Sequence, residues 1–342
     1  MASVSNKFLV QTPRIYHVFR RKGEVQSFGH FLSNIFQPLW MVSLNSTADP
    51  ELHNFLQHIS GFDSVDNEAQ LDMNTMPSAE ISAIYPHKWT FEENPPYWYW
   101  MYYMHLNIRL LNRYRESKGQ ATFSFRPHCG EAGSPFHLID GFLLSSGISH
   151  GIKLRENAPL QYLYYLSQIG IAVSPLSNNS LWLRYSKNPF PDFFRRGLLV
   201  SLSTDDPLVF HHTSEPLIEE YAMASKIYHL TSTDTCEIAK HSVLTSGFSD
   251  SLKRQWLGDG FFIRSSLGND VTKSHVPDTR CAFRFETYHD EIRYLNGLST
   301  SSISEGRGGR SFPLGMLDIL QERQLYEIIQ NLRRSNEPMN KL

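Results

Sequence analysis

The chain has 342 residues, of which 41% are hydrophobic and 13% aromatic, and this composition excludes both an intrinsically disordered chain and a small disulfide scaffold. Its 32 basic and 34 acidic residues give a net charge of -2, so no basic excess can neutralise a phosphate backbone, and nucleic acid is excluded as an expected partner. Three widely separated cysteines indicate a reducing compartment, and the lack of a signal segment or of an apolar run of about 18 residues predicts a soluble, cytoplasmic protein with no membrane contact.

Strand-like runs alternate with stretches of helical periodicity along most of the chain, and this order is typical of a parallel sheet. Six consecutive βα units are predicted. Their strands are expected at residues 8–11, 61–65, 122–126, 148–154, 171–174 and 198–203. Their helices are expected at residues 27–36, 95–118, 134–147, 160–169, 191–196 and 216–230, with a further helix at 235–246.

Six units joined by short loops favour a TIM-type (β/α) barrel over a doubly wound sheet, because no glycine-rich phosphate loop follows the first strand. A complete barrel of this type has eight units, so the predicted α/β fold lacks two of them. The predicted domains are a partial barrel at 1–296, a flexible linker rich in serine and glycine at 297–312, and a C-terminal helix and tail at 313–342. The polar span 66–94 is expected to form an excursion from the barrel top.

Three strand ends carry the side chains that suit catalysis, because the catalytic groups of barrel enzymes follow the carboxyl ends of the strands. His128 and Glu131 follow the third strand, among glycines that let the backbone turn sharply. His150 follows the fourth strand, and the adjacent acids Asp205 and Asp206 follow the sixth. Adjacent carboxylates repel unless a cation or a substrate donor lies between them, so the pattern indicates a metal beside a carboxyl that handles a proton.

Each of these features also has a purely structural interpretation. A single histidine such as His128 is more often a hydrogen-bonded structural residue than a metal ligand, and an Asp–Asp–Pro sequence after a strand is commonly only an N-cap and turn. The placement of all these groups at strand ends of one barrel favours the functional interpretation. His211 and His212 are disfavoured as metal ligands because adjacent side chains diverge, and nothing else in the sequence builds a nucleophilic site around Cys129.

Several segments resemble those of AMP deaminases. They are FRPHCGEAG at 125–133, ISHG at 148–151, SPLSNNS at 174–180 and SLSTDDP at 201–207, together with shorter matches at 61–66, 93–97 and 219–222. The likeness extends over about 8–286, and adenosine deaminases share only the core of these motifs. The resemblance implies a TIM-type barrel of the metal-dependent hydrolase kind, which deaminates AMP to IMP and ammonia in purine nucleotide metabolism with zinc as its cofactor.

The resemblance also implies roles for individual side chains. His128 and Asp205 match zinc ligands, Glu131 matches the group that protonates N1 of the purine, and His150 matches the general base. Asp206 completes the implied catalytic residues. The implied substrate-binding residues are Glu131, Asp206, Pro207, Leu208 and Val209. In this chemistry a zinc-activated water attacks C6 of the purine, whose electrophilicity depends on the proton at N1, and ammonia leaves.

The sequence departs from the family in one respect. The family supplies a His-x-His pair to zinc from its first strand, and no His-x-His occurs in these 342 residues. The likeness therefore begins at the family's third strand. Little or no activity is expected of the isolated chain, because zinc affinity depends on the number of ligands and on a closed geometry.

Two classes of function follow from these observations. The first is an AMP deaminase, for which the family precedent is a homotetramer and AMP is the small-molecule substrate. The second is a non-catalytic homologue or short isoform that acts as an interaction subunit in mixed oligomers with full-length deaminase subunits, because a barrel without two strands exposes strand edges that favour pairing. A deaminase with another specificity, such as adenosine, is less favoured.

Overall fold

The computed structural model describes residues 6–70 and 78–303. These residues belong to two units, which divide between Ala282 and Phe283 and are considered separately. The first unit holds every described strand, and the described part of the second unit is the larger portion of helix α15 (Asp278–Ile303). None of the described helices combines the length and the apolar run that a membrane span requires.

The described strands form two sheets, and every hydrogen-bonded pair within them is parallel. The strands are β1 (Phe8–Pro13), β2 (Ile59–Val65), β3 (Ser124–Phe125), β4 (His128–Cys129), β5 (Gly147–His150), β6 (Gly170–Val173) and β7 (Val200–Leu202). The first sheet has the order β1-β2-β3 and the second has the order β4-β5-β6-β7. The predicted parallel α/β fold is confirmed, whereas closure of the strands into a barrel stays a prediction.

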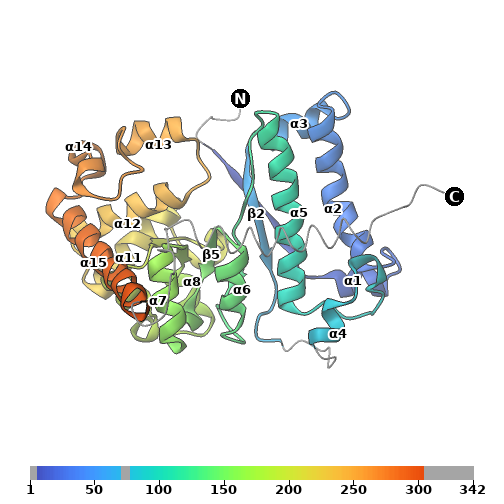
Figure 1. Cartoon of the computed structure of the whole chain (residues 1–342), viewed down its shortest axis with the longest axis horizontal. Coiled ribbons are helices and arrows are strands. Elements are labelled where there is room, and N and C mark those ends of the chain that lie inside the picture. Colours follow the sequence, from blue (N-terminus) through green and yellow to red (C-terminus); the bar gives the residue numbers. More distant parts are fainter. Residues whose placement is uncertain (1–5, 71–77, 304–342) are drawn as a thin grey trace. The chain divides into compact units, whose positions relative to one another are not determined.

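Helices separate most of these strands along the chain (Figure 1). The helices of the first half are α1 (Tyr16–Arg21), α2 (Phe28–Leu44), α3 (Pro50–Leu56), α4 (Ser78–Ser82), α5 (Tyr97–Ser117) and α6 (His137–Leu144). The second half of the first unit contains α7 (Ala158–Ser167), α8 (Pro175–Leu181), α9 (Phe190–Arg195), α10 (Pro207–Phe210), α11 (Pro216–Tyr228), α12 (Ser232–Thr245), α13 (Asp250–Leu257) and α14 (Val271–Ser274). Short 3-10 helices occur at η1 (Pro86–Lys88), η2 (Ile152–Glu156), η3 (Tyr185–Lys187) and η4 (Ser266–Gly268).

The pairing of α2 with α5 shows how local signals build the first half of the fold. Ser27 caps α2, because its hydroxyl oxygen accepts a hydrogen bond from the backbone N–H of His30 at 3.2 Å. The buried rings of Phe28 and Phe31 then pack on Trp100 of α5, with centroids 5.1 and 5.2 Å apart. The helix predicted to begin near residue 27 is therefore confirmed, and its aromatic face anchors it to α5.

The third predicted strand, at 122–126, is wrong in its extent. The structure has β3 and β4 in its place, and these two strands belong to different sheets. Pro127 stands between them, and its missing N–H cannot join a ladder of hydrogen bonds. The chain consequently changes sheets directly before His128.

The fourth predicted strand, at 148–154, ends earlier than expected. His150 has a φ of 68° and Gly151 a φ of 61°, so the backbone leaves the strand conformation there and continues as η2. The prediction also missed α8, because its serine and asparagine residues hide any apolar periodicity. The one local signal was Pro175, which stands at a favoured first position of a helix.

Helix α15 extends further than the predicted domain boundary. It reaches Ile303, so the first residues of the predicted linker at 297–312 are helical. Serine disfavours a helix only weakly, and adding a residue to a formed helix costs far less than starting one. Residues 304–312 and the helix and tail predicted at 313–342 lie outside the described residues.

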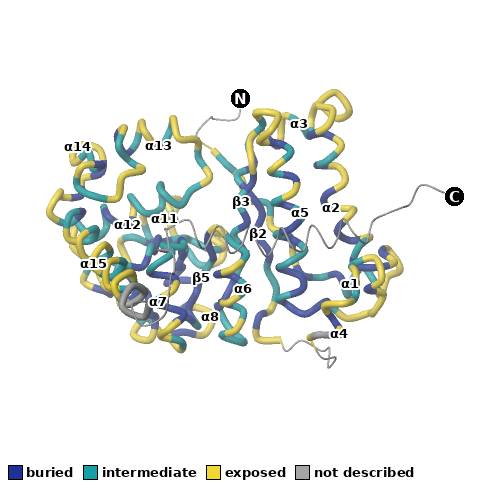
Figure 2. The backbone as a smooth tube through the Cα atoms, viewed as in Figure 1, coloured by how far each residue is buried: buried dark blue, intermediate teal, exposed yellow. Residues whose placement is uncertain are grey.

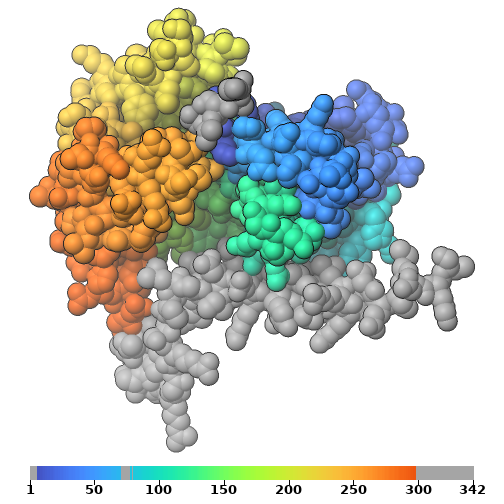
Figure 3. Space-filling view, turned by 90° about the horizontal axis from the view of Figure 1, so that it is seen from above, coloured from blue at the N-terminus to red at the C-terminus, as the bar shows by residue number. Residues whose placement is uncertain are grey.

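The interior of the first unit is formed where strands and helices meet. Figure 2 shows β2 and β5 in the buried part of the molecule, and most residues of β2 are buried. The first half of this unit, blue to green, and its second half, yellow to orange, lie on opposite sides of the face in Figure 3. Among the buried residues of β2 is Asp63, only 4% exposed, and a buried carboxylate requires polar partners.

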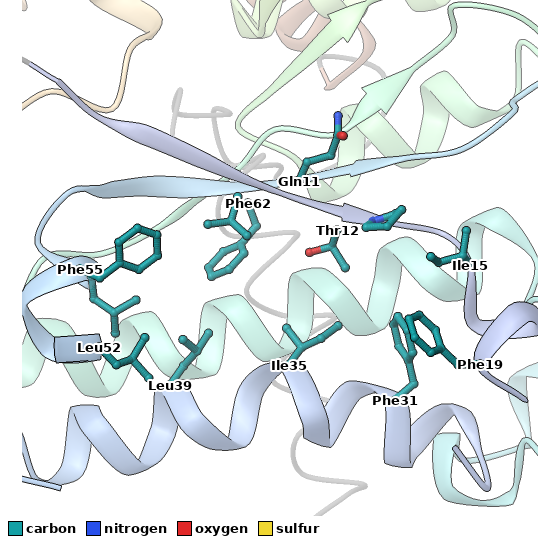
Figure 4. A pocket seen from close by; sticks show the side chains of 13 residues that line it. Gln11, Thr12, Ile15, Phe19, Phe31, Ile35, Leu39, Leu52, Phe55 and Phe62 are labelled. Atoms are coloured by element: carbon teal, nitrogen blue, oxygen red, sulfur yellow. The ribbon is translucent and has the colours of Figure 1, made fainter. Parts of the chain in front are cut away.

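A cavity of about 380 Å³ lies beside β1 (Figure 4). Apolar side chains of α2 and α3, such as Phe31, Leu39 and Phe55, line one side of it. Figure 4 shows Gln11 on the other face of β1, directed away from these apolar side chains. None of the residues that line the cavity is a predicted site residue, so the cavity has no assigned part in the chemistry.

Candidate active site

The structure brings three of the predicted site residues together. One ring nitrogen of His128, one of His150 and a carboxylate oxygen of Asp205 all lie within 4.8 Å of one another. The parallel pairing of β4 with β5 contributes to this, because Cys129 stands in register with His150 and the two imidazole centroids are 4.9 Å apart. Asp205 follows β7 in the same sheet.

Asp63 holds His128 from the neighbouring sheet. Its Oδ1 atom accepts a hydrogen bond from the His128 backbone N–H at 3.0 Å and lies 3.0 Å from Nδ1 of the same residue. The other oxygen accepts a hydrogen bond from Nε2 of Gln11 at 3.1 Å. Burial acts to lower the pKa of His128, but the hydrogen bond and the charge of Asp63 contribute most to outweighing it, so the pKa is raised. A carboxylate on one ring nitrogen leaves Nε2 as the nitrogen available to a metal.

His150 is the most enclosed member of the cluster, with 2% of its side chain exposed. Its Nδ1 atom lies 3.6 Å from Oε1 of Glu131, and its Nε2 atom lies 3.8 Å from Oδ2 of Asp205. Burial, followed by the charge of His128, lowers its pKa to about 3. The imidazole is therefore neutral at physiological pH and can accept a proton. His150 and Asp205 both have positive φ, of 68° and 55°, a strained conformation that concentrates at functional sites.

Glu131 is a carboxyl that holds its proton unusually well. Burial, followed by the charge of Asp205, raises its pKa from 4.5 to about 7. About half of the Glu131 side chains are thus protonated at neutral pH, whereas an exposed glutamate would be almost fully ionised. The carboxyl can donate a proton to a basic atom placed beside it.

Glu68 fixes the loop that presents Glu131. Its buried carboxylate accepts hydrogen bonds from the backbone N–H groups of Gly130 at 2.7 Å and Glu131 at 3.4 Å. The loop approaches Glu68 so closely that a Cβ atom at Gly133 would lie 1.7 Å from the Glu68 carbonyl oxygen, and Gly133 also has a φ of 65°. Only glycine fits this position.

Helix α8 supplies two buried side chains to the cluster. The Ser177 hydroxyl donates a hydrogen bond to Oδ2 of Asp205 at 2.6 Å. The Asn178 amide nitrogen lies 3.4 Å from Oε1 of Glu131 and 3.4 Å from Nδ1 of His150. Both side chains are fully buried, so α8 forms a fixed wall of the site. The sequence analysis assigned no role to either residue, although both lie in the segment 174–180 that resembles the family.

The remaining predicted site residues lie in a turn beside the cluster. Asp206 precedes α10, and Pro207, Leu208 and Val209 form the start of that helix. Asp206 is exposed, as are Leu208 at 99% and Val209 at 70%. These residues do not belong to the group of ligand atoms, and their side chains are accessible to a bound molecule.

The cluster is chemically suited to a zinc ion. Zinc in proteins takes imidazole nitrogens and carboxylate oxygens, and a catalytic zinc site commonly has three protein ligands and one open position. His128, His150 and Asp205 provide two nitrogens and one oxygen that lie within 4.8 Å of one another. Their donor types therefore fit zinc, and Asp63 supplies the outer carboxylate typical of histidines that bind metals.

The fold and the site together define a parallel α/β protein with a cluster of side chains that could hold a metal ion next to a carboxyl of raised pKa. Residues 1–301 match the sequence profile described as AMP deaminase, and the chain belongs to the AMP deaminase family.

Individual relatives agree with this family assignment. The chain is 49% identical to AMP deaminase of Saccharomyces cerevisiae over 290 residues, which are 85% of this chain and 35% of the yeast protein. It is 48% identical to human AMP deaminase 1 over 295 residues, which are 86% of this chain and 39% of the human protein. The chain thus spans between a third and two fifths of the length of these relatives. Among solved structures, it is similar to adenine deaminase from Arthrobacter aurescens, with a TM-score of 0.42 and 21% identity over 61% of this chain and 55% of the other.

Proposed function

We propose that this site hydrolyses AMP to IMP and ammonia. The observation that carries the proposal is the convergence of His128, His150 and Asp205 beside Glu131, a carboxyl whose pKa is raised to about 7. Deamination of a purine needs both a group that gives a proton to the ring and a group that takes one from water. The choice of AMP as substrate rests on the family to which the chain belongs.

We propose zinc as the cofactor, held by His128 and Asp205. Bound zinc would supply a water whose pKa is lowered to about 7 and which is therefore a nucleophile at neutral pH. His150 lies within reach as a third ligand and second nitrogen donor, but its neutral imidazole is assigned here to proton transfer.

The residues of this chain have the following parts in the proposed reaction. Glu131 gives its proton to N1 of the purine, which makes C6 electrophilic, and His150 accepts a proton from the attacking water. The C6–O bond forms, and the C6–N6 bond breaks as the amino group takes the proton held by His150 and leaves as ammonia. The second proton of the water returns to Glu131 as the C6 carbonyl forms. Asp206 and the turn Pro207, Leu208 and Val209 contact the substrate.

We extend the proposal to the setting of the reaction. The strands are taken to belong to a TIM-type barrel within 1–296, and the protein is taken to act in the cytoplasm. Its expected assembly is a homo-oligomer, with a tetramer as the family precedent, or a mixed oligomer with full-length subunits. Low turnover by the chain on its own stays a prediction.

The test is ammonia release from AMP by the purified 342-residue chain with added zinc. We expect slow turnover that a chelator abolishes and that Glu131→Gln abolishes, because the amide has no acidic proton to give. Adenosine serves as the comparison substrate and should react more slowly than AMP. A folded, zinc-loaded chain that shows no Glu131-dependent release of ammonia, either alone or mixed with full-length subunits, would refute the proposal and favour a non-catalytic interaction subunit.

A further inference from the structure

Another buried carboxylate contacts two segments that lie next to the site. Glu220 belongs to α11, and neither its side chain nor that of its partner His211 has any exposed surface. Glu220 is not one of the groups that converge on the metal position. Burying a carboxylate is costly unless its oxygens are fully hydrogen-bonded, so its partners indicate what holds it there.

The two oxygens of Glu220 bind two different segments. Oε1 accepts a hydrogen bond from the backbone N–H of Leu176 at 2.9 Å, in the first turn of α8. Oε2 lies 2.8 Å from Nε2 of His211, the residue that follows α10. The other ring nitrogen of His211 has no hydrogen-bond partner among the described residues, so its polar contact with Glu220 sets the orientation of the ring.

Both segments carry the site. Helix α8 supplies Ser177, which binds Asp205, and Asn178, which lies between Glu131 and His150. On the other side, α10 follows Asp205 and Asp206 directly along the chain. The Glu220 carboxylate thus joins α8, which supports Asp205 through Ser177, to the segment of α10 and His211 that follows Asp205 in the chain.

Helix α8 needs such an anchor. It has seven residues, and a helix of this length is unstable in water unless tertiary contacts hold it. Its N-cap residue, Ser174, makes no side-chain capping hydrogen bond. Glu220, which belongs to α11, accepts the hydrogen bond that a capping side chain would accept, and its negative charge is favourable at a helix N-terminus.

We propose that Glu220 and His211 form a clamp that positions α8, and through Ser177 and Asn178 the metal ligand Asp205 and the proton-transfer pair Glu131 and His150. This inference rests on the proposed function, since it deepens the account of the same site. Glu220 and His211 are positioning residues, because neither is assigned a contact with substrate or metal.

The clamp can be tested with a variant that keeps its shape. Glu220→Gln has nearly the same volume, but its amide has one acceptor oxygen in place of two, so it cannot reproduce both contacts at the two carboxylate oxygen positions when Nε2 of His211 carries the proton. The matched control is Glu219→Gln on the same helix, whose carboxylate binds only His212 and Thr213 among the described hydrogen bonds. The readouts are zinc affinity, by competition with a chromophoric chelator, and amide hydrogen exchange of residues 174–183.

We expect Glu220→Gln to weaken zinc binding about 10-fold, as loss of an outer partner of a metal ligand does, and to speed exchange at 174–183. The control should change neither. The double variant tests whether the clamp acts through Ser177. If it does, adding Glu220→Gln to a chain that already carries Ser177→Ala should weaken zinc binding by less than about threefold, because the two changes are coupled. Unchanged zinc affinity in folded Glu220→Gln, or full additivity with Ser177→Ala, would overturn the proposal.

A second pair of variants covers the case in which Glu220→Gln does not fold. His211→Gln keeps an N–H donor at a similar reach and should retain zinc affinity, whereas His211→Leu removes it and should lose about 10-fold. Equal affinities in these two variants would count against the clamp. If the wild-type chain binds no zinc, the proposed function fails, and amide hydrogen exchange of residues 174–183 becomes the only test of the clamp. Unchanged exchange in the His211→Leu variant would then overturn the clamp.

Discussion

The carboxyl of Glu131 makes a quantitative prediction about the metal-free chain. Its pKa rises from 4.5 to about 7 on folding, because burial and the charge of Asp205 disfavour the ionised form. The folded chain therefore binds more protons than the unfolded chain between these two pH values, and stability falls as the pH rises through that window. At about 1.36 kcal/mol per pKa unit, the full penalty is about 3 kcal/mol.

Glu131→Gln should remove this penalty. The amide is uncharged and keeps the Oε1 acceptor that Asn178 contacts, so the variant should be more stable than the wild type by about 1 kcal/mol at pH 5 and about 3 kcal/mol at pH 8. The assay is urea unfolding of both chains in the presence of a chelator at pH 5, 6, 7 and 8, followed by circular dichroism. The variant would thus gain stability while it loses turnover.

The control is Glu219→Gln. Burial acts to raise the pKa of Glu219, but hydrogen bonds from His212 and Thr213 contribute most to outweighing it, and the pKa is lowered. Glu219 therefore titrates below the assay range in both states, and the difference between this variant and the wild type should not change from pH 5 to pH 8. If the stability difference between Glu131→Gln and the wild type is also constant from pH 5 to pH 8, the prediction is wrong, because folding then does not raise the pKa of this carboxyl.

Three further outcomes follow from the geometry of the site. Asp63→Asn should weaken zinc binding about 10- to 100-fold in a chelator competition assay, because it removes the carboxylate that orients a ligand imidazole, and an unchanged affinity would contradict that role. Gly133→Ala should lower the free energy of unfolding by more than about 1–3 kcal/mol, because its Cβ collides with Glu68 in addition to straining the backbone. The control Gly23→Ala has a similar φ but open space around it, so it should lower the free energy of unfolding by less. Equal losses in the two variants would contradict the predicted collision. Leu208→Ala should change the free energy of unfolding by less than about 0.5 kcal/mol, because the side chain is 99% exposed. It should nevertheless raise KM for AMP, and an unchanged KM would mean that Leu208 does not contact the substrate.

Much of the fold follows from signals that are local in the chain. Alternating runs predicted the parallel strands, and the cap at Ser27 marked the start of α2 within a residue. The positions of His128, His150 and Asp205 after three strands indicated that their side chains would meet, because the ends of neighbouring parallel strands lie close together. The same local signals predicted one strand at 122–126 and missed β4, which follows Pro127 and belongs to the other sheet.

Other features depend on contacts between distant parts of the chain. Asp63 meets His128 across 65 positions of sequence, and Asn178 meets Glu131 across 47. No periodicity or spacing encodes such a pair, so the outer partners Asp63, Glu68 and Ser177 were missed even where their segments resembled the family. The role proposed for Glu220 belongs to the same class.

The sequence alone therefore determined the parallel α/β class and the family, and it predicted the side chains that are proposed to react. Only the tertiary structure decided their proton affinities, which oppose one another in Glu131 and His150. The physical reason is that strand and helix signals act between residues a few positions apart, whereas a pKa depends on burial and on charges that folding brings near.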